Sequence, residues 1–220
     1  RPAPEIASLQ NPRVKEAVKL RQRSHRDAQS QFIVEGYREL KRALDNGLKP
    51  AALFYCPLLF LGKNEPALIE RCREAGADLS ACTEPVFKKM AYRERPEGLL
   101  ALFAQVRRSL ADLRLPRDPL LIVAETIEKP GNLGTILRTA LGFGLTSLAI
   151  VRPAADVFDP RVVRASMGAL FSLEVRQFDT FEKYRDVYPG HALYPFMLDG
   201  AVPLSRAAKS PDMPYALVFG

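Results

Sequence analysis

The chain has 220 residues, 47% of them hydrophobic, so it has the length for one large domain or two small ones and the composition of a globular protein. No apolar run approaches the roughly 20 residues that span a bilayer, and residues 1–4 do not begin a signal peptide. Cys56, Cys72 and Cys82 form no Cys-x-x-Cys pair and the two histidines form no cluster. The sequence therefore favours a reduced, cytoplasmic protein without a metal site.

The net charge of +7 is unevenly distributed along the chain. Residues 1–106 carry +5, residues 107–118 carry +2, and residues 119–220 are neutral. This asymmetry predicts an N-terminal part that attracts a polyanion and a neutral half with a different task. A basic protein with ordinary solvated faces is the alternative explanation.

Basic side chains crowd the first expected helix and the turn after it. We predict that this arm contacts nucleic-acid phosphates, because Lys and Arg neutralise backbone charge. A solubilising helix face is the alternative. The candidate contact residues are Arg13, Lys15, Arg21, Arg23 and Arg26.

Strand and helix patterns then alternate as far as residue 104, which predicts a small α/β domain over residues 1–106. Strands are expected at 31–34, 51–56 and 99–104, and helices at 36–46, 65–75 and 83–90. Alternating charges and Pro116 predict a linker over 107–118.

From residue 120 the alternation resumes, which predicts a second α/β domain over 119–220 with a mainly parallel sheet. The apolar run 120–124 predicts a buried strand, and a turn leads to a helix that Asn132 can cap. Gly134 and Arg138 share one face of that helix, so a ligand can approach the backbone at the glycine while Arg138 points toward it. Further strands are expected at 147–151, 173–176, 192–197 and 215–219, and further helices after Asp159 and at 180–187.

Three stretches carry a family resemblance. The first is residues 125–140, with Lys129-Pro130-Gly131-Asn132-Leu133-Gly134 and Arg138-Thr139-Ala140; the others are residues 32–40 and 164–173. In this order they resemble the first motif, the start of the RNA-binding domain and a later catalytic-domain segment of the SpoU (TrmH-like) RNA methyltransferases of the SPOUT superfamily.

The resemblance implies transfer of a methyl group from S-adenosylmethionine to a ribose 2′-hydroxyl of RNA. It also implies a SPOUT catalytic domain with a C-terminal trefoil knot, an exception to the rule that chains do not thread loops, and a homodimer. Ribosomal RNA is the expected substrate, because an N-terminal domain of this type is common in members that modify it. Transfer RNA is the alternative substrate.

The resemblance also assigns roles to individual residues. Arg138 matches the arginine beside the target ribose, and we expect it to bind RNA, hold a phosphate and stabilise developing alkoxide charge. Asn132 would orient Arg138 or the ribose. Gly220 aligns with a glycine that contacts the adenosyl group, and Met197 and Leu198, at a strand end, are further cofactor candidates. A structural ion pair is the alternative role of Arg138.

Residues 215–220 match the strand that opens the family's second motif, and the sequence does not contain the rest of that motif or the third. Those parts hold most of the adenosine pocket and the return of the knot, so we expect the chain to be a fragment. A non-catalytic RNA-binding protein on the same fold is the alternative that these missing motifs leave open.

Overall fold

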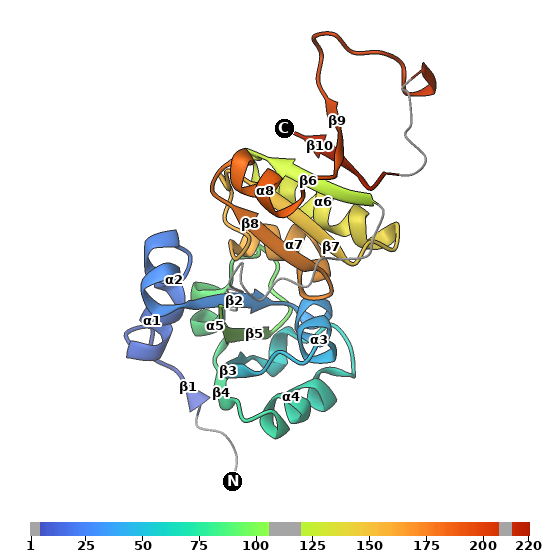
Figure 1. Cartoon of the computed structure of the whole chain (residues 1–220). Helices are drawn as coiled ribbons and strands as arrows, with labels where there is room; N and C mark the ends of the chain where they lie inside the picture. The colour runs from blue at the N-terminus through green and yellow to red at the C-terminus, as the bar shows by residue number, and fades with distance from the viewer. Residues whose placement is uncertain (1–4, 106–119, 207–212) are drawn as a thin grey trace.

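The computed structural model describes residues 5–105, 120–206 and 213–220, which form two five-stranded sheets (Figure 1). The first contains β1 (Glu5–Ile6), β4 (Asp78–Cys82), β3 (Pro50–Tyr55), β5 (Leu99–Ala104) and β2 (Gln31–Glu35), in that spatial order. The second contains β8 (Glu174–Phe178), β7 (Ser147–Val151), β6 (Leu120–Glu125), β10 (Tyr215–Phe219) and β9 (Ala192–Phe196).

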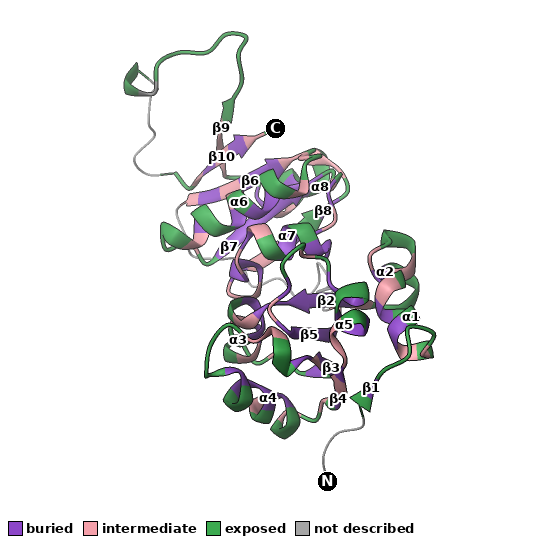
Figure 2. Ribbon diagram, turned by 180° about the vertical axis from the view of Figure 1, so that it is seen from behind, coloured by how far each residue is buried: buried purple, intermediate pink, exposed green. Residues whose placement is uncertain are grey.

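The first sheet is mixed. Strand β4 runs parallel to β1 and β3, whereas β5 runs antiparallel to both β3 and β2. The accompanying helices are α1 (Pro12–Lys19), α2 (Arg23–Gln29), α3 (Tyr37–Asp45), η1 (Pro57–Leu59), α4 (Glu65–Glu74) and α5 (Glu84–Met90). Both faces of this sheet are buried, and Figure 2 shows the exposed sides of the helices turned outward.

Every strand pair of the second sheet is parallel. Its helices are α6 (Pro130–Gly142), α7 (Pro160–Ala165), η3 (Ala169–Phe171), α8 (Phe181–Val187) and η4 (Leu204–Arg206). Leu148 and Ile150 of β7 pack on the α6 side, while Ala149 and Val151 pack on the side of Tyr184 from α8. Alternation along a strand thus separates two cores, and helices cover both faces.

One hydrophobic core joins the two sheets. Phe32 and Leu40 of the N-terminal part share a cluster with Leu133, Phe158 and Val162 of the C-terminal part. The ring centroids of Phe32 and Phe158 lie 4.8 Å apart. Helix α6, which carries the catalytic candidate Arg138, packs against α7, and α7 packs against β2, so α7 connects α6 to the N-terminal sheet.

The α/β class and the mainly parallel second sheet are confirmed. Two expectations about the N-terminal part were incomplete: strands β1 and β4 were not foreseen, and the basic arm forms two helices, with Arg23 and Arg26 in the second. The predicted linker at 107–118 lies outside the described residues, and the trefoil knot stays a prediction.

Candidate functional site

Arg138 lies in the third turn of α6 with its side chain exposed. Its Nη1 donates a hydrogen bond to Sδ of Met167 at 3.3 Å. Within the described ranges no carboxylate forms an ion pair with this guanidinium, so the alternative role as a structural ion pair finds no partner there. A thioether is a weak, neutral acceptor, so the positive charge of Arg138 is not neutralised.

Gly134 serves the packing of two helices, so the expectation that a ligand approaches the backbone there was wrong. A Cβ on Gly134 would lie 2.5 Å from Cβ of Ala165, 2.8 Å from the backbone nitrogen of Ser166 and 2.9 Å from the carbonyl oxygen of Val162. Helix α7 therefore occupies the space that the missing side chain leaves. This close contact holds α6, and with it Arg138, against α7.

Asn132 does not cap the helix, in contrast to the expectation. Helix α6 begins at Pro130 with Lys129 as the N-cap residue, since proline suits the first helical position. Asn132 is the exposed third residue of the helix and lies six positions before Arg138, so the two side chains leave different faces of α6. Its role toward the ribose stays a prediction.

The predicted cofactor residues lie at the carboxyl ends of adjacent strands. Met197 and Leu198 follow β9 with exposed fractions of 57% and 97%. Gly220 follows β10, and a Cβ there would lie 3.2 Å from the carbonyl oxygen of Glu125 at the end of β6. This is the edge of a parallel sheet where α/β proteins bind their ligands.

Two aromatic rings extend this edge. Phe196 and Phe219 are stacked with centroids 4.6 Å apart and an interplanar angle of 9°. Phe196 is 48% exposed, so a flat aromatic surface faces solvent beside Met197 and Gly220. Apolar side chains and a ring stack match the chemistry of an adenosyl group. The residues present thus fit this part of S-adenosylmethionine, and their role in binding it stays a prediction.

The cations of the basic arm differ in their exposure and in the contacts that they make within the protein. Lys15 and Arg23 are exposed on α1 and α2, and the ion-pair contact of Arg23 with a described residue is one of 3.7 Å with Asp27. Arg13 pairs with Asp78 at 2.9 Å and lies over the ring of Phe54. Lys15 and Arg23 are therefore the cations of this arm that are most accessible to a polyanion.

Arg21 is also engaged, because its Nη2 donates to the carbonyl oxygen of Lys89 at 2.9 Å. That bond ties the segment after α1 to α5. A carbonyl does not neutralise the guanidinium, so Arg21 keeps its charge, but a contact with RNA would compete with an existing hydrogen bond.

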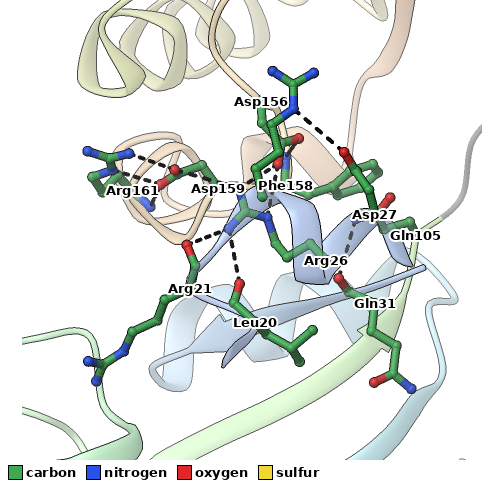
Figure 3. A network of polar contacts seen from close by, with 11 residues as sticks. Leu20, Arg21, Arg26, Asp27, Gln31, Gln105, Asp156, Phe158, Asp159 and Arg161 are labelled. Atoms are coloured by element: carbon green, nitrogen blue, oxygen red, sulfur yellow. Dashed lines mark hydrogen bonds and ion pairs between the residues drawn. The ribbon is translucent and has the colours of Figure 1, made fainter. Parts of the chain in front are cut away.

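Arg26 is not an RNA contact, and that prediction was wrong. Its side chain is 1% exposed and, as Figure 3 shows, points from α2 to Asp156 of the C-terminal part. Its Nε and Nη2 donate to Oδ2 of Asp156 at 2.9 and 2.6 Å, and Nη1 donates to the carbonyl oxygens of Leu20 and Arg21. Asp159 lies 3.8 Å away. Arg26 therefore binds the two parts of the chain together.

The stretch at residues 32–40 has a structural role at its centre. Oε2 of Glu35 accepts hydrogen bonds from the backbone N–H groups of Tyr92 and Arg93. Gly36 has a φ of +103°, and a Cβ there would lie 2.6 Å from Nη2 of Arg93. Burial raises the pKa of Glu35, against the opposing effect of those backbone hydrogen bonds. These residues fix the loop after α5 to β2.

Two arginines of α3 reach the same turn as Arg138, and the sequence alone did not single them out. Nη1 of Arg42 donates to the carbonyl oxygen of Met167 at 2.9 Å, and Nη1 of Arg38 donates to its sulfur at 3.7 Å. Arg38 belongs to the stretch at 32–40, so its position in that motif was the available signal. Its approach to Arg138 depends on packing between distant segments.

Cys72 and Cys82 do not have the properties of reactive thiols. Burial raises the pKa of the Cys72 thiol to about 11 and that of Cys82 to about 12, so both are protonated at neutral pH. Within residues 5–105, 120–206 and 213–220, no helix has the length and apolar character to cross a membrane. The same ranges contain no group of three or more His, Cys, Asp or Glu placed to hold a metal ion.

Comparison with known proteins adds to this geometry. Residues 11–101 match a family described as the MRM3-like substrate binding domain, and residues 119–220 match the SpoU rRNA Methylase family. The mitochondrial rRNA methyltransferase 3 of Xenopus laevis is 32% identical over 154 residues, which is 68% of this chain and 36% of that protein. The chain thus spans little more than a third of the length of this curated relative.

Two solved structures resemble the fold along almost the whole chain. One, described as an AdoMet-bound rRNA methyltransferase from Sinorhizobium meliloti, has a TM-score of 0.85 and 28% identity and covers 99% of this chain and 81% of that one. The other, described as an RNA 2′-O ribose methyltransferase, has a TM-score of 0.79 and 31% identity and covers 97% and 80%.

Proposed function

The chain belongs to the SpoU methylase family, and we propose that it transfers a methyl group from S-adenosylmethionine to a ribose 2′-hydroxyl of ribosomal RNA. The observation that carries this proposal is Arg138: an exposed guanidinium on the helix after the first strand of the parallel sheet, without a carboxylate partner in the described part of the chain. The names of its relatives support the substrate class.

S-adenosylmethionine supplies an activated methyl carbon when bound. The protein therefore has to position the ribose hydroxyl and assist the loss of the hydroxyl proton. Phe196, Phe219, Met197, Leu198 and the backbone at Gly220 would hold the adenosyl group. Arg138 binds a phosphate beside the target ribose and stabilises negative charge that develops on the ribose oxygen. A guanidinium stays protonated, so its contribution is electrostatic.

The proposal is tested by incubating the full-length protein with labelled S-adenosylmethionine and purified RNA. We expect label in ribosomal RNA and none in transfer RNA. Label in transfer RNA alone would favour the alternative substrate. Tight RNA binding without any label would favour the alternative of a non-catalytic RNA-binding protein, and would contradict the proposed activity.

The exposed cations of the basic arm give a second prediction. Lys15→Ala and Arg23→Ala are each expected to weaken RNA binding and to reduce the salt slope of log Kd by about 1, because one phosphate contact is lost. RNA titrations at several salt concentrations measure both quantities. Lys183→Ala on α8, an exposed lysine paired with Asp179, is the control and is expected to leave the slope unchanged. If both arm variants have the same salt slope of log Kd as the unmodified protein, the arm does not contact the RNA.

Two features of the biological setting stay predictions, namely a homodimer and a cytoplasmic location. The name of the relative from Xenopus laevis places that protein in mitochondria. Sedimentation of the full-length protein would measure its oligomeric state.

A further inference from the structure

The turn between α7 and η3 forms a tight contact between the two parts of the chain. Met167 and Gly168 both have positive φ, at +53° and +79°. A Cβ on Gly168 would lie 3.1 Å from Cβ of Arg42 and 3.3 Å from Cα of Glu39, both on α3. Glycine thus lets α3 approach this turn closely. The hydrogen bond from Arg42 to the carbonyl oxygen of Met167 fixes this turn against α3.

Two guanidinium groups from different parts of the chain contact the sulfur of Met167. Nη1 of Arg138 lies 3.3 Å from it and Nη1 of Arg38 lies 3.7 Å from it. Because both nitrogens contact one atom, the two positive charges are close together. A thioether offers no negative charge, so nothing in this contact compensates the repulsion between them.

The lack of a carboxylate distinguishes this pair from Arg26 and Arg93, two arginines near the domain contact. Arg26 pairs with Asp156, and Arg93 pairs with Glu39. Among the residues described, neither Arg38 nor Arg138 forms an ion pair, and both are exposed. Two adjacent, solvent-facing guanidinium groups match the several acceptor oxygens of one phosphate group.

We infer that Arg38 and Arg138 together bind one backbone phosphate of the RNA, so that the N-terminal part contributes a residue directly to the methyl-transfer site. This inference rests on the proposed function of Arg138 and adds Arg38 as a positioning residue. The shared phosphate sets the target ribose in place only when the RNA contacts both parts of the chain at once.

The test compares Arg38→Ala, Arg138→Ala and the double variant with Arg73→Ala, which removes an exposed arginine of α4 that is paired with Glu70. Equilibrium binding of a fluorescent ribosomal RNA fragment is measured first, since binding requires no turnover. Arg38→Ala is expected to raise Kd about tenfold, as expected for the loss of a charge-assisted hydrogen bond, and to reduce the salt slope by about 1. The double variant is expected to lose less affinity than the sum of the single effects.

Methylation kinetics supply the second readout. Arg38→Ala is expected to raise KM for RNA and to leave KM for S-adenosylmethionine unchanged. An Arg38→Ala variant that binds and methylates RNA like Arg73→Ala would overturn the inference, as would strictly additive binding effects. If the unmodified protein binds RNA but transfers no methyl group, the proposed activity fails, while the binding titrations still decide whether Arg38 and Arg138 share a phosphate.

Discussion

Arg138→Ala is expected to lower the maximal rate of methyl transfer by about 100- to 1,000-fold, the usual effect of removing one group that stabilises charge in a transition state. The physical reason is that Arg138 is an exposed cation on α6, the helix that follows β6, and has no carboxylate partner in the described part of the chain. Single-turnover methylation at saturating RNA and cofactor measures the rate without the contribution of binding. The fold is expected to be unaffected, since the side chain is exposed.

Two variants serve as controls for this loss. Arg138→Lys keeps a positive charge but not the planar fork, so it is expected to recover part of the rate. Arg185→Ala removes an exposed arginine of α8, which packs on the opposite face of the sheet, and is expected to keep full activity. Full activity in Arg138→Ala, or equal losses in Arg138→Ala and Arg185→Ala, would contradict the role given to Arg138.

Arg26→Ala is expected to destabilise the protein by about 3 to 5 kcal/mol, because it leaves a buried carboxylate without its partner. The side chain of Asp156 is 10% exposed, and two of its hydrogen bonds come from Arg26. Although burial opposes ionisation, the hydrogen bonds from Arg161 hold the pKa of the neighbouring Asp159 below its usual value, which favours the charged form of Asp159. Denaturant unfolding monitored by circular dichroism measures the change.

Arg23→Ala in the same helix is the matched control, and is expected to change stability by less than about 1 kcal/mol because its ion pair is exposed. A double replacement, Arg26→Met with Asp156→Leu, is expected to regain most of the stability lost in Arg26→Ala, since no unpaired charge remains. Arg26→Ala with the stability of the unmodified protein would contradict the description of this pair as a clamp between the two parts.

Much of the fold followed from local patterns in the sequence. Continuous apolar runs predicted β6, β7 and β10, and Asp159 followed by Pro160 predicted the start of α7, where the Asp159 side chain does accept the hydrogen bond from the backbone of Arg161. These features depend on neighbours a few residues apart, which a sequence displays directly. Arg138 is exposed, and its orientation toward a bound ligand stays a prediction.

The errors concern residues whose environment comes from distant segments. The guanidinium of Arg26 is buried by Asp156, which lies 130 residues later in the chain. Gly134 is small because α7 crosses it, and the spacing of Gly134 and Arg138 cannot distinguish a helix contact from a ligand contact. A basic residue in a charged run was therefore assigned to RNA although it holds the fold together. Charge patterns alone do not separate these roles.

We propose that this chain methylates a ribose oxygen, and nucleoside mass spectrometry of RNA modified by the protein distinguishes this reaction from methylation of a base. Ribosomal RNA treated with the protein and isotope-labelled S-adenosylmethionine is digested to nucleosides, and the labelled methyl group is assigned to the ribose or the base. We predict that the label is on the ribose 2′-oxygen and is strongly reduced when Arg138→Ala replaces the unmodified protein. Label on a base would contradict the assignment.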